Sequence, residues 1–278
     1  MRKNRTGTIV LTCAAALAAI AVFLPLWWVF ASSLRPGNTY VKYTSPLSWL
    51  AFIPIGGDFS NYVNLLQGPF VLGLVNSFIV AGATILFGLA IAIPAAYALA
   101  TIDFPGKKIV FSFIILVAMV PFDAIAIPLS GLFQNWGLSD SYAGLILPAL
   151  ANGFAIFVLR QFFLGIPGEL LDAAEVDGLG RFATLWYIVL PLSRPAMIGA
   201  AMMLFLSQWA AYLWPLLIGT SPERQLAPIA LANLSTMFTV DLGQILAGSF
   251  VLSIIPMILL LFFQKQYTES LSTTGLKG

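Results

Sequence analysis

Residues 9–31 read IVLTCAAALAAIAVFLPLWWVFA, an apolar run of 23 residues without a charged side chain. The hydrocarbon core of a bilayer is ~30 Å thick, and ~20 apolar residues in a helix cross it. This run is therefore long enough to span a membrane. It is also longer than the core of a signal peptide, so we interpret it as a retained transmembrane helix.

Five further apolar runs follow it, at residues 71–100, 109–129, 142–159, 195–218 and 242–264. They do not alternate polar and apolar residues, as the strands of a membrane barrel would. The third run is interrupted by Pro121 and Asp123, which makes its limits the least defined. The sequence predicts an all-α integral membrane protein of about six transmembrane helices, in one domain covering residues 1–278.

The composition excludes several classes of protein. Hydrophobic residues make up 60% of the chain and charged residues only 9%, too few to cover the surface of a soluble domain. The net charge of +2 does not indicate nucleic-acid binding, and the complete absence of histidine removes the commonest general base and metal ligand. The single cysteine allows neither an internal disulfide nor a cysteine metal cluster. We expect neither an enzyme nor a metalloprotein.

The distribution of Lys and Arg predicts the orientation. With the N-terminus in the cytoplasm, ten of the 13 basic residues lie in cytoplasmic segments and three outside, in agreement with the positive-inside rule. Both termini are then cytoplasmic. Residues 161–193 form the longest cytoplasmic segment, and residues 32–70 and 219–241 form two extended external segments.

The cytoplasmic segment has the pattern of two short helices around a glycine. Pro167 suits the first turn of a helix, and the acids that follow it favour the helix N-terminus. Ala173 and Ala174 are small helix formers, so another surface can approach the backbone closely. Gly178 fits a left-handed helix end, and a second helix from Arg181 is expected to stop near Pro191. An ordinary amphipathic connection would also fit these features.

The spacing within this segment resembles a known motif. Asp172-Ala-Ala174, Gly178 and Ile188-Val-Leu-Pro191 match the EAA loop of bacterial ABC importer permeases at every interval, with aspartate in place of the first glutamate. Shorter matches along most of the chain, among them Ser32-Ser-Leu-Arg-Pro36, Asn76-Ser77 and Tyr212-Leu-Trp-Pro215, resemble the carbohydrate-uptake, maltose-permease-like branch. The resemblance implies a type I importer permease fold in the plasma (inner) membrane of a bacterium.

The resemblance also implies partners. They are a sister permease subunit, two ATPase subunits, an extracytoplasmic sugar-binding protein and the lipid bilayer. The chain has no phosphate-binding loop of the Gly-x-x-x-x-Gly-Lys-Ser/Thr type, so ATP and Mg²⁺ would be bound by the ATPase, with no cofactor in this chain. The residues that would contact or support the ATPase are Glu169, Asp172, Ala173, Ala174, Asp177, Gly178, Arg181, Leu190, Pro191 and Lys277.

Polar residues within the predicted membrane spans are candidates for a substrate path, because their insertion is costly. Gln208, Trp209 and Tyr212 combine an amide, a phenol and rings, which suits the hydroxyls and CH face of a sugar. An aromatic belt at the membrane interface would explain the two aromatic residues equally well. Asp123 is either a pathway residue or the polar start of a helix after Pro121, and Asn152 is a further candidate.

The predicted spans contain no lysine or arginine, which favours a neutral mono-, di- or oligosaccharide over an anion. A permease for glycerol phosphate or another small polar solute is the alternative. An ion-coupled secondary transporter would need a relay of buried ionisable groups, and only Asp123 qualifies.

Overall fold

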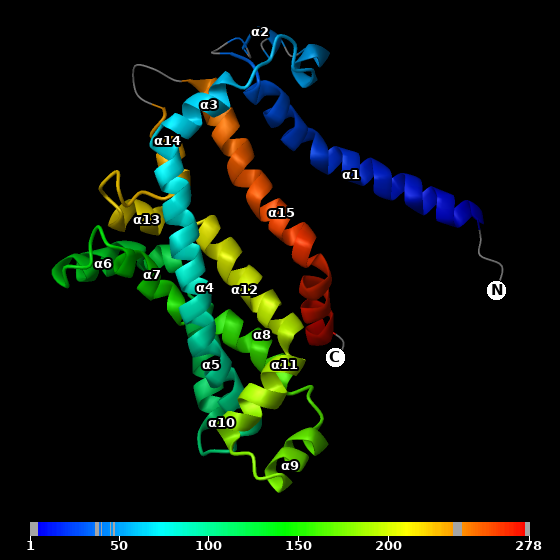
Figure 1. Cartoon of the computed structure of the whole chain (residues 1–278), viewed down its shortest axis with the longest axis vertical. Coiled ribbons are helices and arrows are strands. Elements are labelled where there is room, and N and C mark those ends of the chain that lie inside the picture. Colours follow the sequence, from blue (N-terminus) through cyan, green and yellow to red (C-terminus); the bar gives the residue numbers. More distant parts are fainter. Residues whose placement is uncertain are drawn as a thin grey trace. The chain divides into compact units, whose positions relative to one another are not determined.

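The computed structural model describes residues 5–36, 39, 41–44, 46, 48–235 and 241–275, and within these residues it is built from helices (Figure 1). The prediction of an all-α protein is confirmed. Contacts along the chain group into two compact units. The first unit holds residues 1–71 and 230–254, and the second holds residues 72–229 and 255–278. We describe each unit by itself.

The first unit contains a folded segment after its first helix. Its elements are α1 (Arg5–Ser33), α2 (Val41–Thr44), η1 (Trp49–Phe52) and α3 (Ser60–Gln67). Asn61 is buried, and its amide donates to the carbonyls of Ser33 and Arg35, both at 2.7 Å. These bonds satisfy carbonyl groups at the end of α1, which have no partner within the helix.

The second unit carries most of the remaining helices. They are α4 (Phe70–Thr101), α5 (Lys107–Ala118), α6 (Phe122–Asn135), α7 (Tyr142–Leu150), α8 (Gly153–Phe163), α9 (Gly168–Val176), α10 (Arg181–Thr184), η2 (Leu185–Val189), α11 (Leu190–Leu192), α12 (Arg194–Trp209) and α13 (Leu213–Ile218). Helices α14 (Ala227–Ala232) and α15 (Leu242–Gly275) continue from one unit into the other.

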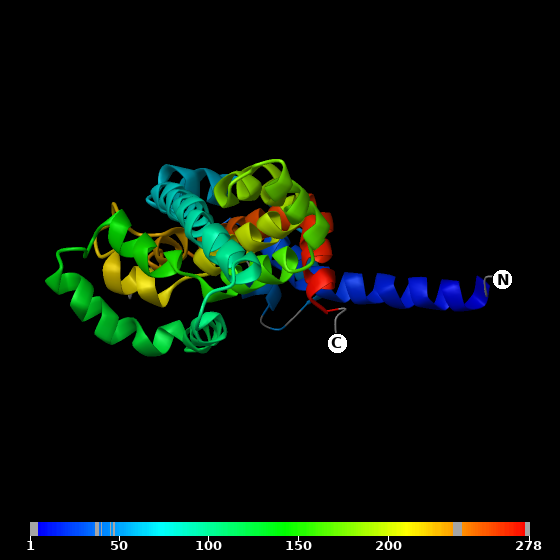
Figure 2. The same cartoon turned by 90° about the horizontal axis from the view of Figure 1, so that it is seen from below.

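Three helical segments of the described chain are long and apolar enough to cross a membrane: Ile9–Ser33, Phe70–Thr101 and Leu242–Gln266. Three bent pairs raise the number to six if each pair is one span. They are Lys107–Ala118 with Phe122–Asn135 at 90°, Tyr142–Leu150 with Gly153–Phe163 at 42°, and Arg181–Leu192 with Arg194–Trp209 at 82°. Figure 2 shows α5 and α6 as separate segments running in different directions.

The breaks have local causes. Pro121 has no N–H to donate and disfavours a helical conformation at Val120, so α5 ends at Ala118 and α6 begins at Phe122. Asn152 caps α8, because its side-chain oxygen accepts from the amide of Ala155 at 3.0 Å. The expected run 195–218 also divides, with α12 ending at Trp209 and α13 starting at Leu213.

The helix from Arg181 ends close to Pro191, as the sequence predicts. It continues through Leu192, because η2 is a wider π-helical turn in which the amide of Leu190 donates to the carbonyl of Leu185. A proline in a helix clashes with the carbonyl four residues earlier. The widened turn directly before Pro191 gives that ring room, and the chain bends only at Ser193 and Arg194.

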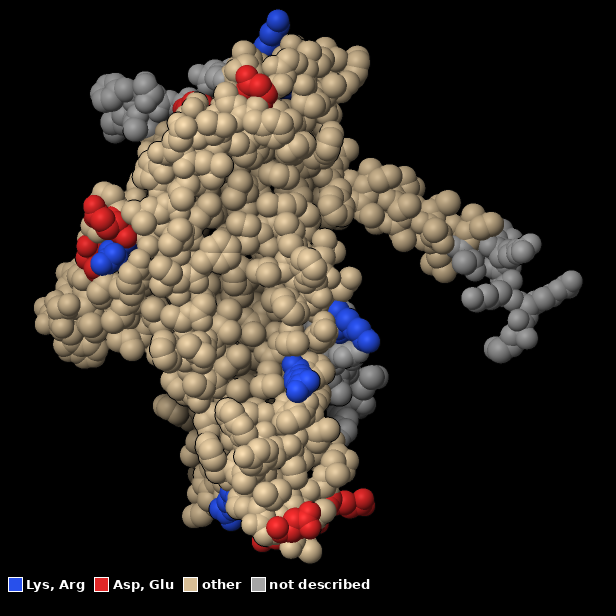
Figure 3. Space-filling view, in the orientation of Figure 1, with Lys and Arg blue, Asp and Glu red and all other residues tan. Residues whose placement is uncertain are grey.

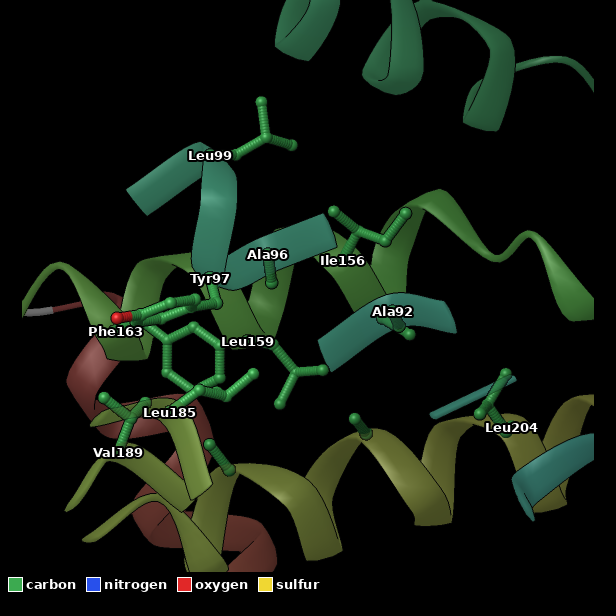
Figure 4. Close-up of a cluster of buried hydrophobic side chains, with 13 residues drawn as sticks. Ala92, Ala96, Tyr97, Leu99, Ile156, Leu159, Phe163, Leu185, Val189 and Leu204 are labelled. Carbon is green, nitrogen blue, oxygen red and sulfur yellow. The ribbon is translucent and has the colours of Figure 1, made fainter. Parts of the chain in front are cut away.

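A buried apolar cluster joins α4, α8, η2 and α12 in the second unit (Figure 4). Ala92 and Ala96 of α4 are about 1% exposed or less, so that their small side chains let the neighbouring helices approach closely. Leu159 and Phe163 of α8 lie in the same cluster, which also contains Leu185, Val189 and Leu204. The segment around α9 is thus attached at both ends to a packed core.

Candidate coupling loop and cavity

Helix α9 and the turn after it form the first candidate site. Pro167 precedes α9, whose first turn contains Glu169, as the sequence predicts for a helix N-terminus. Gly178 has φ +79°, the left-handed conformation expected for it. The amide of Leu179 donates to Ala174 O at 2.9 Å, and the amide of Gly178 donates to Glu175 O at 3.0 Å. These two bonds are the Schellman pattern, which ends a helix at a glycine.

Most of the side chains predicted for this site are exposed. Glu169, Asp172, Ala173, Asp177 and Arg181 all face away from the packed core. Figure 3 shows acidic side chains gathered where Figure 1 draws α9. Their carboxylates remain available to a partner protein.

The other predicted residues differ in exposure. Ala174 is 2% exposed and packs inward, so it supports the turn and does not itself offer a docking surface. Leu190 is half-buried and Pro191 is exposed. Lys277 lies outside the described residues. Helix α15 continues to Gly275, past residue 264, at which the predicted span ends.

Two large apolar side chains beside the turn were not predicted from the sequence as part of the site. Val176 is 87% exposed and Phe182 is 77% exposed. In the sequence they lie two residues before and four residues after Gly178, and Val176 stands between Glu175 and Asp177. Apolar groups exposed together and rimmed by polar residues are typical of protein-binding sites. The signal in the sequence was their position on both sides of the helix-ending glycine.

A cavity of about 1050 Å³ is the second candidate site, and its lining comes from the second unit. Four of the five residues predicted for a substrate path line it: Asp123, Asn152, Gln208 and Tyr212. They come from α6, the α7–α8 break, α12 and the α12–α13 break. The bends in the helix pairs therefore bring together residues that are up to 89 positions apart in the sequence.

The polar groups of the cavity are held in different ways. Gln208 donates from Nε2 to the hydroxyl of Thr84 at 2.9 Å, which anchors its amide to the buried face of α4. Asp123 is exposed in the first turn of α6, directly after the break at Pro121. Tyr212 is 46% exposed, so its ring and hydroxyl are accessible.

Trp209 does not line the cavity. It is 6% exposed and packs against Phe205 and Phe78, with ring centroids at 5.3 Å and 5.1 Å. Its place in the candidate path was predicted together with Gln208 and Tyr212, but Trp209 is the last residue of α12, whereas Tyr212 lies in the break after this helix. The rings of Phe113, Phe122 and Phe154 line the cavity instead.

The sequence matches the family of binding-protein-dependent transport system inner membrane components over residues 85–269. The arabinooligosaccharide transport permease AraQ of Bacillus subtilis is 32% identical, with 97% of this chain and 96% of AraQ aligned. The trehalose transport permease SugB of Mycobacterium tuberculosis is also 32% identical, with 92% of each chain aligned. The sn-glycerol-3-phosphate permease UgpE of Yersinia pestis is 34% identical over 73% of each chain.

A solved bacterial ABC transporter involved in the import of alginate has the same fold. Its TM-score is 0.77 at 22% identity, with 96% of this chain and 98% of that chain covered. The chain therefore belongs to the family of inner membrane components of binding-protein-dependent transport systems. It is a permease subunit of an ABC importer and not an enzyme, and a substrate-binding protein is one of its partners.

Proposed function

We propose that this chain forms half of the membrane path for a neutral sugar, with a sister permease subunit as the other half. The importer has two ATPase subunits, one of which docks on the segment around α9 of this chain, and an extracytoplasmic sugar-binding protein delivers the substrate. Both termini lie in the cytoplasm. The observation that carries this proposal is the exposed α9 turn, in which Gly178, the glycine of the EAA spacing, ends the helix in the left-handed conformation.

The α9 turn has the properties of a docking element. Its backbone is fixed by the hydrogen bonds around Gly178, while the carboxylates and the apolar side chains of Val176 and Phe182 remain exposed. A preorganised element loses little conformational freedom when a partner binds. Because η2 and α8 pack in the same core, a force on the turn reaches the membrane helices through tightly packed contacts.

The cavity supports a sugar as the substrate. Its lining offers hydrogen-bonding groups from Asn152, Gln208 and Tyr212 together with aromatic rings, a combination that suits hydroxyls and the CH face of a pyranose. Asp123 is the only charged residue among those that line it, and none is Lys or Arg. An anion would meet a carboxylate here without a counter-charge from this chain.

The relatives are named for substrates of both kinds. AraQ is named for arabinooligosaccharides and SugB for trehalose, whereas UgpE is named for glycerol 3-phosphate. Glycerol phosphate is the second candidate, supported by the 34% identity to UgpE. A competition experiment separates the two. Uptake of a labelled neutral disaccharide or oligosaccharide should be inhibited by unlabelled neutral sugars and not by glycerol 3-phosphate.

Reconstitution tests the proposed function directly. The chain, its sister subunit and the ATPase are placed in liposomes with binding protein outside and ATP inside. We expect the ATPase to copurify with the chain, and uptake to require ATP and to persist when ionophores collapse the ion gradients. Uptake that stops with the gradients and continues without ATP would identify an ion-coupled secondary transporter instead.

The path residues are tested in the same liposomes. Replacing Gln208 by Leu removes a hydrogen-bonding group in the cavity and the bond to Thr84, so uptake should fall several-fold, since one hydrogen bond contributes ~0.5–1.5 kcal/mol. Tyr212→Ala should lower uptake more than Tyr212→Phe, which keeps the ring. Trp209→Phe is the control for a residue that packs outside the cavity. Full uptake by Gln208→Leu and Tyr212→Ala would show that the cavity is not part of the substrate path.

A further inference from the structure

The turn between α13 and α14, which we call the outer turn (Thr220–Gln225), projects from the second unit with its tip exposed. Thr220, Pro222 and Glu223 are exposed, whereas Leu226 and Ala227 directly after the turn are buried. Figure 3 shows acidic and basic side chains close together beside α13, on a surface that carries little other charge. The turn lies at the opposite end of α4 from α9 (Figure 1).

Asn76, near the start of α4, holds the base of this turn. Its Nδ2 donates to the carbonyls of Glu223 and Gln225, both at 2.9 Å, across 147 and 149 residues of sequence. Asn76 is completely buried, and the two bonds that it donates to the turn are partly buried. Loss of this side chain would leave both carbonyls without their donor, which makes it important for the conformation of the turn.

Neighbouring groups complete the attachment. The hydroxyl of Tyr142 donates to Asn76 Oδ1 at 2.6 Å, because an amide oxygen can only accept a hydrogen bond. The hydroxyl of Ser77 accepts from the amide of Ala227 at 2.9 Å. The guanidinium of Arg224 lies over the ring of Tyr142, 4.6 Å from its centroid.

The other end of the turn is held by the loop between α6 and α7. A carboxylate oxygen of Asp140 accepts from the amide of Ser221 at 2.8 Å, and the amide of Asp140 donates to the carbonyl of Ile218 at 2.7 Å. Asp140 adopts φ +52°, a conformation that aspartate tolerates better than most residues. The tip at Pro222 and Glu223 is therefore fixed on both sides by side chains from other elements.

We infer that Asn76 is a positioning residue that holds the outer turn in one conformation, and that this preorganised turn sets the affinity of the importer for its binding protein. A turn without these bonds would have to be ordered at the moment of binding, and ordering it lowers affinity. Because Asn76 belongs to α4, the turn is attached to a helix that also contributes Thr84 to the anchoring of Gln208.

This inference rests on the proposed function, since it assumes that a binding protein docks at this end of the importer. The experiment uses the assembled importer in nanodiscs, and compares wild type with Asn76→Ala, Asn76→Asp, Tyr142→Phe and Glu223→Ala. Hydrogen exchange reports the order of residues 219–229, and titration with loaded binding protein gives the half-saturating concentration and the maximal rate of ATP hydrolysis. Ser130→Ala is the matched control, because it removes a buried hydroxyl whose bond is local to α6.

Asn76→Ala should raise exchange in residues 219–229 and raise the half-saturating concentration about tenfold, equivalent to ~1.4 kcal/mol, with the maximal rate retained. Asn76→Asp keeps the acceptor for Tyr142 but loses both donors to the turn, so it should behave like Asn76→Ala. Tyr142→Phe keeps both donors and should have a smaller effect. Glu223→Ala changes the tip alone, so it should shift the titration without raising exchange.

Unchanged exchange in both Asn76 variants would overturn the positioning role. Increased exchange with an unchanged half-saturating concentration would overturn the link to binding-protein affinity. A wild-type importer that binding protein does not stimulate would instead contradict the proposed function, and is seen before any variant is made.

Discussion

The two short helices of the candidate coupling site are separated by Gly178, and this turn depends on the φ angle of that one residue. Nothing lies within 4 Å of the position that a Cβ would take there, so space is not the constraint. The constraint is φ +79°, which costs a residue with a side chain ~1–2 kcal/mol. A β-branched residue is disfavoured further, because it is a genuine outlier in this region.

We therefore expect Gly178→Val to abolish transport and to loosen the ATPase, while the chain still inserts in the membrane. Gly178→Asn is the matched control, since asparagine adopts the left-handed conformation more readily and should keep most of the activity. Uptake and ATPase copurification, compared at equal expression, provide the measurement. Normal uptake by Gly178→Val would show that the turn does not couple the subunits.

At the scale of the elements, the close approach of α5 and α8 depends on Gly153. A Cβ at this position would lie 2.7 Å from the Cβ of Ala118 and 3.0 Å from the carbonyl oxygen of Ile114. Neither atom belongs to a flexible side-chain end, so the two helices would have to separate. Gly153 also follows Asn152, whose cap bond starts α8 at the wall of the cavity.

Gly153→Ala should consequently destabilise the chain by ~1–3 kcal/mol, the usual cost of overpacking. Gly82→Ala in α4 is the matched control, because nothing lies within 4 Å of its Cβ position and alanine favours a helix. Thermal unfolding of both variants in the same detergent gives the comparison. A midpoint for Gly153→Ala at or above that of Gly82→Ala would mean that the α5–α8 contact adapts without strain.

The loop held by Asp140 has a predictable pH dependence. The backbone amide of Ser221, then its hydroxyl, hold the pKa of Asp140 below its ordinary value, with a smaller contribution from the charge of Arg224. A carboxylate whose pKa is lowered by folding stabilises the folded loop above its unfolded pKa of ~3.9. That contribution disappears as the pH falls through the lowered, folded pKa.

We expect hydrogen exchange in residues 219–225, corrected for intrinsic rates, to stay constant between about pH 5 and pH 8 because Asp140 is fully ionised there. It should rise only in more acidic solution. Asp140→Asn retains an acceptor without the charge, and its exchange should not respond to acid at this position. An increase in exchange for the wild-type loop between pH 7 and pH 5 would assign the control of this turn to another group.

At the scale of the whole molecule, assembly with the ATPase is expected to involve the C-terminal end. Helix α15 continues to Gly275, so residues 265–275 would approach a partner as a helix. Deletion of residues 271–278 should weaken ATPase copurification and uptake more than Lys277→Ala does, because a single exposed ion pair contributes only ~0.2–1 kcal/mol. Full assembly and transport by the deletion variant would make this end dispensable.

The segment after α13 is better tested by a substitution than by a deletion. Removing residues 223–231 would delete Leu226, Ala227 and Ile229, which are 2% exposed or less, and would damage the packing of the second unit. Loss of uptake in such a variant would say nothing about docking. Substitutions at the exposed tip leave the buried residues in place, and are therefore the better probe of this surface.

The sequence by itself determined the properties that depend on neighbouring residues. Charge-free runs are expelled from water whatever lies beside them, and a glycine that ends a helix is recognised from its local spacing. The all-α membrane fold and the left-handed Gly178 could therefore be predicted. The breaks at Pro121 and Asn152 also have local causes, but no local pattern predicts their bend angles of 90° and 42°.

Only the tertiary structure decided which distant side chains meet. It placed Asp123, Asn152, Gln208 and Tyr212 around one cavity and turned Trp209 away from it, because the bends between helices set those directions. It also brought Asn76 to carbonyls 147 and 149 residues away. Such contacts follow from the packing of whole helices, whose bend angles no local pattern specifies, and so no spacing in the sequence could reveal them.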